Sequence, residues 1–247
     1  MTRKWIYGPG VATKTIFRVV AVVTALVAGF APAVASAQPA APLAGFDISA
    51  SQGVPDFAAA KAAGARFVFV KDTAGVGYAN PNFLAQFRGA KAAGLYRSAY
   101  HYARPDQTGG AEQAAYLHTH DGKWFADGMT LPPALDLEDT PGIPACYGRP
   151  PADMVAWIRD FSTELKRRTG HTPIIYTTAR WWTACTGNST AFAADHLLWL
   201  ARYDTTMGEV PGGWTAKFWQ SAVTGPLPGD QDTFFGTLGE LRSLTAS

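Results

Sequence analysis

Runs of extended, β-branched or aromatic residues alternate with helical patterns along most of the chain, and this alternation most constrains the fold. The strongest helical pattern covers 152–168, where apolar residues recur every three or four positions and Gly170 follows. After Thr177 the helical pattern fades and the expected strands lie closer together. The expected strands are 46–49, 66–71, 97–102, 134–138, 173–177, 196–203 and 217–221, and the expected helices are 55–63, 81–93, 111–125 and 152–168.

Alternating strands and helices predict an α/β fold with a parallel sheet and helices outside it. The chain is short for a full eightfold barrel of about 250 residues, so a barrel without its last helices fits the length best. A doubly wound open sheet is the alternative. It gains no support from a nucleotide-binding motif, because the sequence contains neither a GxGxxG nor a Walker loop.

The N-terminus has the three parts of a secretory signal: a basic flank, the apolar run 19–30 and the small residues 35–37. Because the apolar run is shorter than the roughly 20 residues that span a bilayer, we expect cleavage rather than a retained anchor. We therefore expect a signal peptide at 1–37, a linker at 38–44 and a single domain at 45–247. The mature protein would be secreted, without stable membrane insertion.

The charge of the mature sequence argues against a nucleic-acid partner. The predicted signal contains four basic residues and no acid, so its loss moves the formal net charge from +2 to −2. The longest basic run, Lys166-Arg167-Arg168, is typical of a helix C-terminus, where the macrodipole favours cations.

The two cysteines, Cys146 and Cys185, are interpreted as one disulfide, because an even pair in an exported chain is usually bonded. Two free thiols are the alternative, which secretion makes weaker. A metal site is weaker still, because no CxxC motif or clustered His and Cys residues accompany them.

A hydrophobic stretch ends in two acids within LPPALDLEDTPG, residues 131–142. Side chains alternate along a strand, so Asp136 and Glu138 share one face with Cα atoms roughly 6.6 Å apart. Like charges held close cannot both ionise cheaply, so one acid keeps its proton. Glycoside cleavage needs such a proton donor beside an anion. An acidic loop in water, or a calcium site that adds Asp139, is the alternative.

Polar and aromatic residues also occur at the ends of other expected strands. Each alone has an ordinary explanation as a core or turn residue. Their recurrence at one edge favours a site that binds sugar rings, because aromatic faces and convergent hydrogen-bonding groups suit sugars. These residues are Asp47, His101, Tyr102, Arg104, Pro105, Tyr176, Arg202, Tyr203, Trp219 and Gln220, and Asp230 lies in the last expected loop, GDQDTFFG.

Taken in order, these motifs resemble the family 25 glycoside hydrolases, the Ch-type lysozymes, from about residue 45 to the C-terminus. No single motif is specific for the family, but the whole set in this order resembles it strongly. ALDLE resembles the family's acidic strand, and GDQDTFFGT resembles its closing segment. The other matching pieces are GFDIS, ARFVFVK, NPNFLAQFRGAKAAGL, AYHYARP, PIIYTTARWW, LWLARYD and FWQ.

The resemblance implies a modified, incomplete TIM-like barrel, roughly (β/α)5 followed by extra β-strands. It implies hydrolysis of the β-1,4 bond between N-acetylmuramic acid and N-acetylglucosamine in peptidoglycan glycan strands, by a monomer that needs no metal or organic cofactor. By motif match, Glu138 would be the general acid and Asp136 its charged partner, with Asp47 and Asp230 completing an acidic quartet. The implied substrate-binding residues are Tyr176, His101, Arg104, Tyr203, Trp219 and Gln220. Cys146 and Cys185 fall where related bacterial members place a disulfide.

The sequence departs from the family pattern after the second strand. The family often reads Lys-Ala-Thr-Glu-Gly there, whereas this chain reads Lys71-Asp72-Thr73-Ala74-Gly75. Ala74 therefore replaces a glutamate. Asp72 is one place out of register, so we do not expect it to compensate.

Three rival functions follow from the same residues. A non-catalytic glycan-binding protein on a degenerate barrel is motivated by Ala74, and a chitinase would use similar acids. A zinc amidase would need clustered His ligands. His118 and His120 are the closest approach to such a cluster, but they lie two apart in an expected helix and therefore diverge.

Overall fold

The computed structural model describes residues 1–6, 8–16 and 41–246. The apolar run and cleavage site of the predicted signal peptide lie outside the described residues, as do the first residues of the predicted linker. Residues 1–6 and 8–16 are exposed and have no regular secondary structure. Within the described ranges, no helix is long and apolar enough to cross a membrane.

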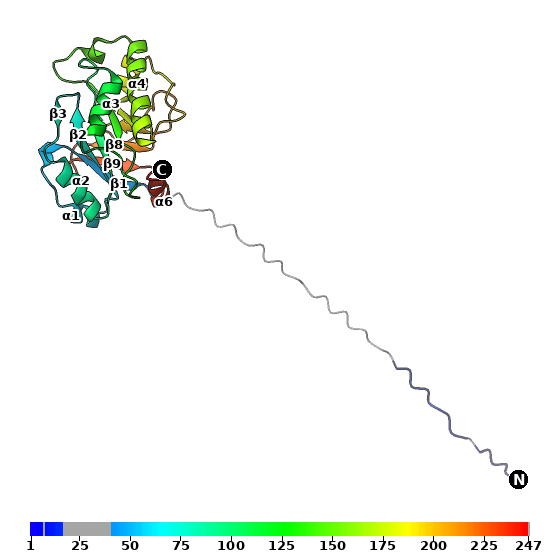
Figure 1. Cartoon of the computed structure of the whole chain (residues 1–247). Helices are drawn as coiled ribbons and strands as arrows, with labels where there is room; N and C mark the ends of the chain where they lie inside the picture. The colour runs from blue at the N-terminus through cyan, green and yellow to red at the C-terminus, as the bar shows by residue number, and fades with distance from the viewer. Residues whose placement is uncertain (7, 17–40, 247) are drawn as a thin grey trace. The chain divides into compact units, whose positions relative to one another are not determined.

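The strands of the folded unit form one sheet that closes into a barrel (Figure 1). Following the hydrogen bonds, the order is β1-β9-β8-β7-β6-β5-β4-β2, and β2 then pairs with β1. Neighbours are parallel except around β9, which is antiparallel to both β8 and β1; β3 is a short antiparallel addition to β2. The strands are β1 Leu43–Ile48, β2 Phe67–Ala74, β3 Tyr78–Ala79, β4 Tyr96–Tyr102, β5 Ala134–Leu137, β6 Ile174–Thr177, β7 Leu198–Ala201, β8 Phe218–Ala222 and β9 Asp230–Phe234.

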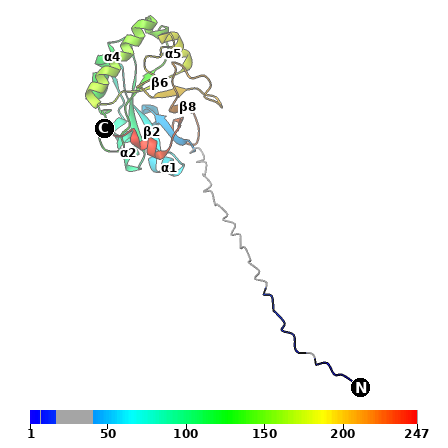
Figure 2. The same ribbon diagram turned by 90° about the vertical axis from the view of Figure 1, so that its right-hand side faces the viewer.

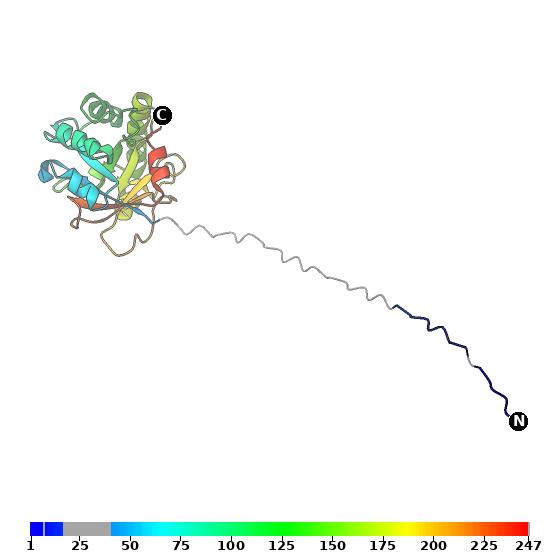
Figure 3. The ribbon, with the colours of Figure 1, turned by 90° about the horizontal axis from the view of Figure 1, so that it is seen from below.

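The helices connect the parallel strands and lie around the outside of the barrel (Figures 2 and 3). One α-helix follows each of β1, β4, β5 and β6, and another lies between β3 and β4, whereas β7, β8 and β9 follow one another without an α-helix. This is the expected (β/α)5 arrangement followed by extra strands. The helices are α1 Phe57–Ala62, α2 Phe83–Ala92, α3 Gly110–Thr119, α4 Pro151–Thr169, α5 Ala179–Thr186 and α6 Leu238–Ser243, with 3-10 turns η1 Ala50–Gln52 and η2 Ala145–Gly148.

The barrel separates two apolar cores, because side chains alternate across each strand. The inner core fills the barrel with aromatic rings from β2, β7, β8 and β9. The outer core lies between the strands and the helices that surround them. The inner core also contains Leu241 of α6, and Leu244 packs against it, so the last helix closes one end of the barrel.

The seven predicted strands and four predicted helices are all present, with shifted ends, whereas β3, α5, β9 and α6 were not predicted from local patterns. The helix predicted over 111–125 ends at Thr119. Helix α5 was missed although its buried residues Trp181, Trp182, Cys185 and Thr186 recur at helical spacing, because it is only eight residues long and follows β6 almost directly. Strand β9 was predicted as a loop because GDQDTFFG is polar, but its polar residues pair inside the barrel wall.

The predicted disulfide is confirmed: Cys146 and Cys185 are bonded, and the described residues include no free cysteine. The bond joins η2, which follows the acidic strand β5, to α5, which follows β6. Both segments begin at the edge of the barrel where the predicted acids lie. The bond therefore restrains two of the loops around that edge.

Replacing both cysteines by serine should lower the free energy of unfolding by about 4 kcal/mol, because the bond closes a long loop whose unfolded state gains entropy on release. The sequence separation of the two cysteines is 39. Urea titration of oxidised wild type and the double variant measures the difference. A loss below about 1 kcal/mol would show that these loops are held without the bond.

Candidate active site

A polar cavity of about 110 Å³ opens at the barrel edge where the parallel strands end. Seven strands contribute to it, because the carboxyl ends of parallel strands meet at one edge and the antiparallel strand β9 begins there. The lining residues are Asp47, Tyr100, Asp136, Glu138, Tyr176, Trp199, Tyr203, Gln220 and Asp230. We call this space the acid cavity. Seven of the ten predicted catalytic and substrate-binding residues line it.

Strand register brings the acids together. Asp136 of β5 is opposite Tyr176 of β6, and its neighbours Leu135 and Leu137 belong to the outer core. The predicted alternation along ALDLE is therefore present, and Asp136 faces into the barrel. On the far side, β9 places Asp230 opposite Asp47 of β1.

Gln220 joins the far acids to two tyrosines. Its Nε2 donates to Oδ2 of Asp47 at 2.6 Å and to Oδ2 of Asp230 at 3.2 Å. Its Oε1 accepts from the hydroxyls of Tyr176 and Tyr203, each at 2.8 Å. Because Gln220 is 2% exposed, this amide fixes all four partners from inside the barrel.

Trp199 forms the floor of the acid cavity. Its ring stacks on Phe69 with centroids 4.0 Å apart, and its Nε1 donates to Oδ1 of Asp232 at 2.8 Å. Sequence reasoning missed Trp199, Tyr100 and Asp232. Strand alternation could have found Asp232, which lies two residues after Asp230 and therefore on the same face.

The Asp136 and Glu138 side chains make no hydrogen bond to any described residue, although Asp136 is only 4% exposed. Burial, followed by the neighbouring Glu138 charge, raises the pKa of Asp136 well above its usual range. Burial also raises the pKa of Glu138, against the lowering effect of Lys71. The prediction gave the proton to Glu138 alone. Burial raises the pKa of both acids, and the assignment of the proton to Glu138 stays a prediction.

Burial also shifts the pKa values of the acids on β1 and β9, which are Asp47, Asp230 and Asp232. Burial, with the charge of Asp230 next in size, raises the pKa of Asp47 to about 7. Burial raises the pKa of Asp232 well above its usual range, and burial also raises that of Asp230. Burial therefore raises the pKa of the acids on both sides of the acid cavity.

The structure places two predicted substrate-binding residues, His101 and Trp219, outside the acid cavity, so their contact with substrate stays a prediction. His101 alternates with Tyr100 and points into the outer core, where its nitrogens meet Oγ1 of Thr73 at 2.8 Å and Oε1 of Gln113 at 2.9 Å. Trp219 alternates with Gln220, and its Nε1 donates to the Arg202 carbonyl oxygen at 2.9 Å.

Two other predictions fall beside the acid cavity. Arg104 lines a neighbouring pocket together with Lys71 and Ala74. Asp139, considered as part of a calcium site, is exposed and forms an ion pair with Arg180 instead. Within residues 1–6, 8–16 and 41–246, no group of three His, Cys, Asp or Glu side chains is placed to hold a metal ion.

The sequence and the fold both match known proteins. The sequence model of Glycosyl hydrolases family 25 matches residues 46–230. An N,O-diacetylmuramidase of Chalaropsis sp is 45% identical over 205 residues, which are 81% of this chain and 97% of the relative. Lysozyme M1 of Streptomyces globisporus is 38% identical over 206 residues, 81% of this chain and 70% of the relative. The structure of a family GH25 lysozyme from Aspergillus fumigatus has 41% identity and a TM-score of 0.81, covering 84% of this chain and 100% of that one.

Because these acids are buried, we expect the free energy of unfolding to fall as pH rises. The folded pKa of Asp47 is about 7 against an ordinary value of 3.8, so between these values the folded state binds more protons than the unfolded state. Asp47→Asn should remove part of this slope and raise the free energy of unfolding at pH 8 by on the order of 1–3 kcal/mol. Denaturant titrations from pH 4 to 8 measure it.

The control is Asp153→Asn, which changes an exposed acid of α4 and should leave the slope unchanged. If the free energy of unfolding of Asp47→Asn falls with pH as steeply as that of wild type, Asp47 is charged in the folded protein at neutral pH.

Proposed function

The chain belongs to glycosyl hydrolase family 25, and we propose that it is a secreted muramidase acting on peptidoglycan. It would cleave the β-1,4 bond between N-acetylmuramic acid and N-acetylglucosamine. The observation that carries the proposal is the pair of neighbouring carboxyls, Asp136 and Glu138, which line one cavity at the barrel edge and make no side-chain hydrogen bond to a described residue. The names of its relatives support the choice of substrate.

In the proposed reaction, Glu138 donates the proton to the glycosidic oxygen. Glu138 is the more exposed of the pair, so it can reach a glycan lying in the cavity mouth. Asp136 lies deeper and is 4% exposed. One proton shared by the two acids leaves one negative charge, which stabilises the positive charge that develops on the reacting sugar.

The attacking group is either the 2-acetamido oxygen of the substrate, oriented by Asp136, or a water molecule. Asp47 and Asp230 face the pair across the acid cavity and are joined by Gln220. In this proposal they complete the acidic quartet, and Tyr176 and Tyr203 add hydroxyls beside the reacting sugar. Tyr203 is 57% exposed and forms part of the rim, where a sugar ring can contact it.

We propose the same organisation of the chain as the sequence predicts: a signal peptide at 1–37, a linker at 38–44 and one catalytic domain at 45–247. The disulfide supports export, because such bonds persist in oxidising compartments. The enzyme would act as a monomer on glycan strands outside the cell, with no cofactor.

Glu138→Gln should fold normally and lose at least about 100-fold in the rate of clearing a peptidoglycan suspension, because it removes the proton donor without changing its size. The matched control is Asp139→Asn, the adjacent exposed acid, which should retain clearing. Turbidity decrease measures both. Wild-type clearing by Glu138→Gln would remove Glu138 from the role.

The same assay tests the rival glycan-binding function. A binding protein would be retained on the insoluble wall and release no new reducing ends. The wild-type protein is expected to release them in proportion to the loss of turbidity.

A further inference from the structure

A second and larger pocket of about 480 Å³ lies beside the acid cavity, at the carboxyl ends of β2 and β4. The register of β4 and β5 places Tyr102 of this pocket opposite Asp136. The two spaces are therefore adjacent along the barrel edge. The pocket is lined by Lys71, Ala74, Gly77, Tyr78, Tyr102, Arg104, Gln107 and Thr140. We call it the lysine pocket.

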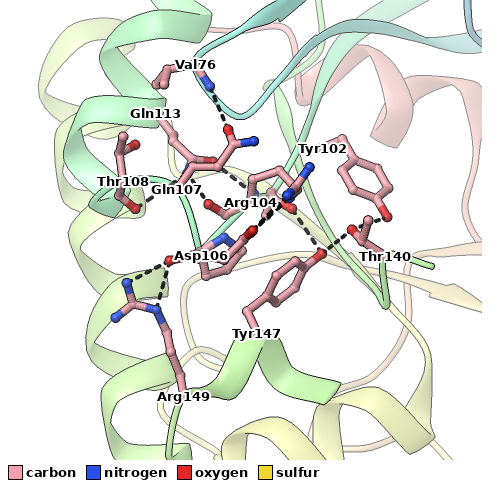
Figure 4. A network of polar contacts seen from close by, with 12 residues as sticks. Val76, Tyr102, Arg104, Asp106, Gln107, Thr108, Gln113, Thr140, Tyr147 and Arg149 are labelled. Atoms are coloured by element: carbon pink, nitrogen blue, oxygen red, sulfur yellow. Dashed lines mark hydrogen bonds and ion pairs between the residues drawn. The ribbon is translucent and has the colours of Figure 1, made fainter. Parts of the chain in front are cut away.

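The walls of the lysine pocket are held by hydrogen bonds (Figure 4). The Tyr102 hydroxyl donates to the Asp139 carbonyl oxygen at 3.0 Å and lies 2.9 Å from Oγ1 of Thr140. Thr140 in turn contacts the hydroxyl of Tyr147, which is anchored to the carbonyl oxygens of Ala103 and Glu138. The loop that follows the catalytic strand therefore forms one wall of the pocket.

The lysine pocket is lined by two cations and no acid. Arg104 is already paired, because its Nε and Nη2 donate to Asp106 at 2.9 and 2.7 Å. The ammonium group of Lys71 makes no hydrogen bond or ion pair with a described residue. Its Nζ lies 4.2 Å from the centre of the Tyr102 ring and 5.9 Å from that of Tyr100.

Lys71 is also close enough to the acid cavity to lower the pKa of both Asp136 and Glu138. Its ammonium group lies near a ring from each space, Tyr100 of the acid cavity and Tyr102 of the lysine pocket. Ala74, on the same strand, offers no carboxylate that could neutralise Lys71 from within the pocket. The pocket thus has a positive charge available to a ligand, a half-buried tyrosine ring, and the 38% exposed Tyr78 at its rim.

We propose that the lysine pocket binds a carboxylate carried by the glycan strand next to the bond that is cleaved, with Lys71 as its partner. The inference rests on the proposed muramidase function and adds a basis for substrate preference. Peptidoglycan offers this chemistry from two sources. One is the lactyl carboxylate of a peptide-free muramic acid, and the other is a carboxylate of the attached peptide.

Four soluble substrates of one glycan length test the proposal and separate the sources. Two are peptide-free, with the lactyl carboxyls either free or amidated. Two bear peptides, with the peptide carboxyls either free or amidated. Wild type should show a kcat/KM about tenfold higher on the charged member of at least one pair. The pair that shows the preference identifies the source.

Ala74→Glu and Ala74→Gln form a matched pair that differs only in charge. Glu at position 74 places a carboxylate beside Lys71, so the preference for charged substrate should fall about tenfold, whereas Gln should keep it. Lys71→Gln should also abolish the preference and Lys71→Arg retain it, each measured at the pH optimum of the variant. The wild-type preference should weaken as salt rises, because the pocket is open to solvent.

Equal kcat/KM on charged and amidated substrates by wild type would overturn the proposal. An equal preference for charged substrate in Ala74→Glu and Ala74→Gln would also overturn it, provided that thermal melting shows both variants to be folded. In either case, continued cleavage of the amidated substrates would leave the muramidase function standing. Failure of wild type to cleave any of the four would overturn both.

Discussion

Closure of the barrel by β9 is the constraint on which the site depends. This strand runs antiparallel between β8 and β1, and it is the element that completes the ring of hydrogen bonds. Its direction makes it begin at the edge where the parallel strands end. Asp230 therefore lies opposite Asp47, and Asp232 lies opposite Gln220. Without β9, Asp230 would have no fixed position relative to Asp136 and Glu138, whereas Asp47 is also held through β2 and β4.

The barrel interior then determines the pKa values of these acids. Aromatic rings fill it up to Trp199, which is 1% exposed and stacks on Phe69, so the acids lie on an apolar floor. Desolvation raises their pKa values, and Gln220 provides a neutral amide link rather than a counter-charge. Burying acids in this way costs stability, which the two apolar cores must offset. Lys71, whose charge lowers the pKa of Asp136 and Glu138, lines the larger pocket, so the two neighbouring spaces differ in charge.

Much of the fold could be predicted from the sequence, because parallel strands and their helices have strong local patterns. Alternation along ALDLE correctly placed Asp136 inside the barrel. The same rule, applied to AYHYARP and KFWQS, would have placed His101 and Trp219 on the opposite face from Tyr100 and Gln220. Strand β9 could not be recognised locally, since its polar residues are compatible with a strand only when barrel closure buries them. The hydrogen bond between Trp199 and Asp232 joins residues that are distant in sequence, so it required the fold.

The identity of the sugar at the new reducing end tests the central claim most directly. Peptidoglycan digested to completion by the wild-type protein can be reduced with borohydride and its fragments identified by mass spectrometry. If the acid pair cleaves after muramic acid, the reduced ends will be N-acetylmuramitol. Reduced ends that are N-acetylglucosaminitol would contradict the account, because the barrel edge would then position the other glycosidic bond of the strand over Glu138.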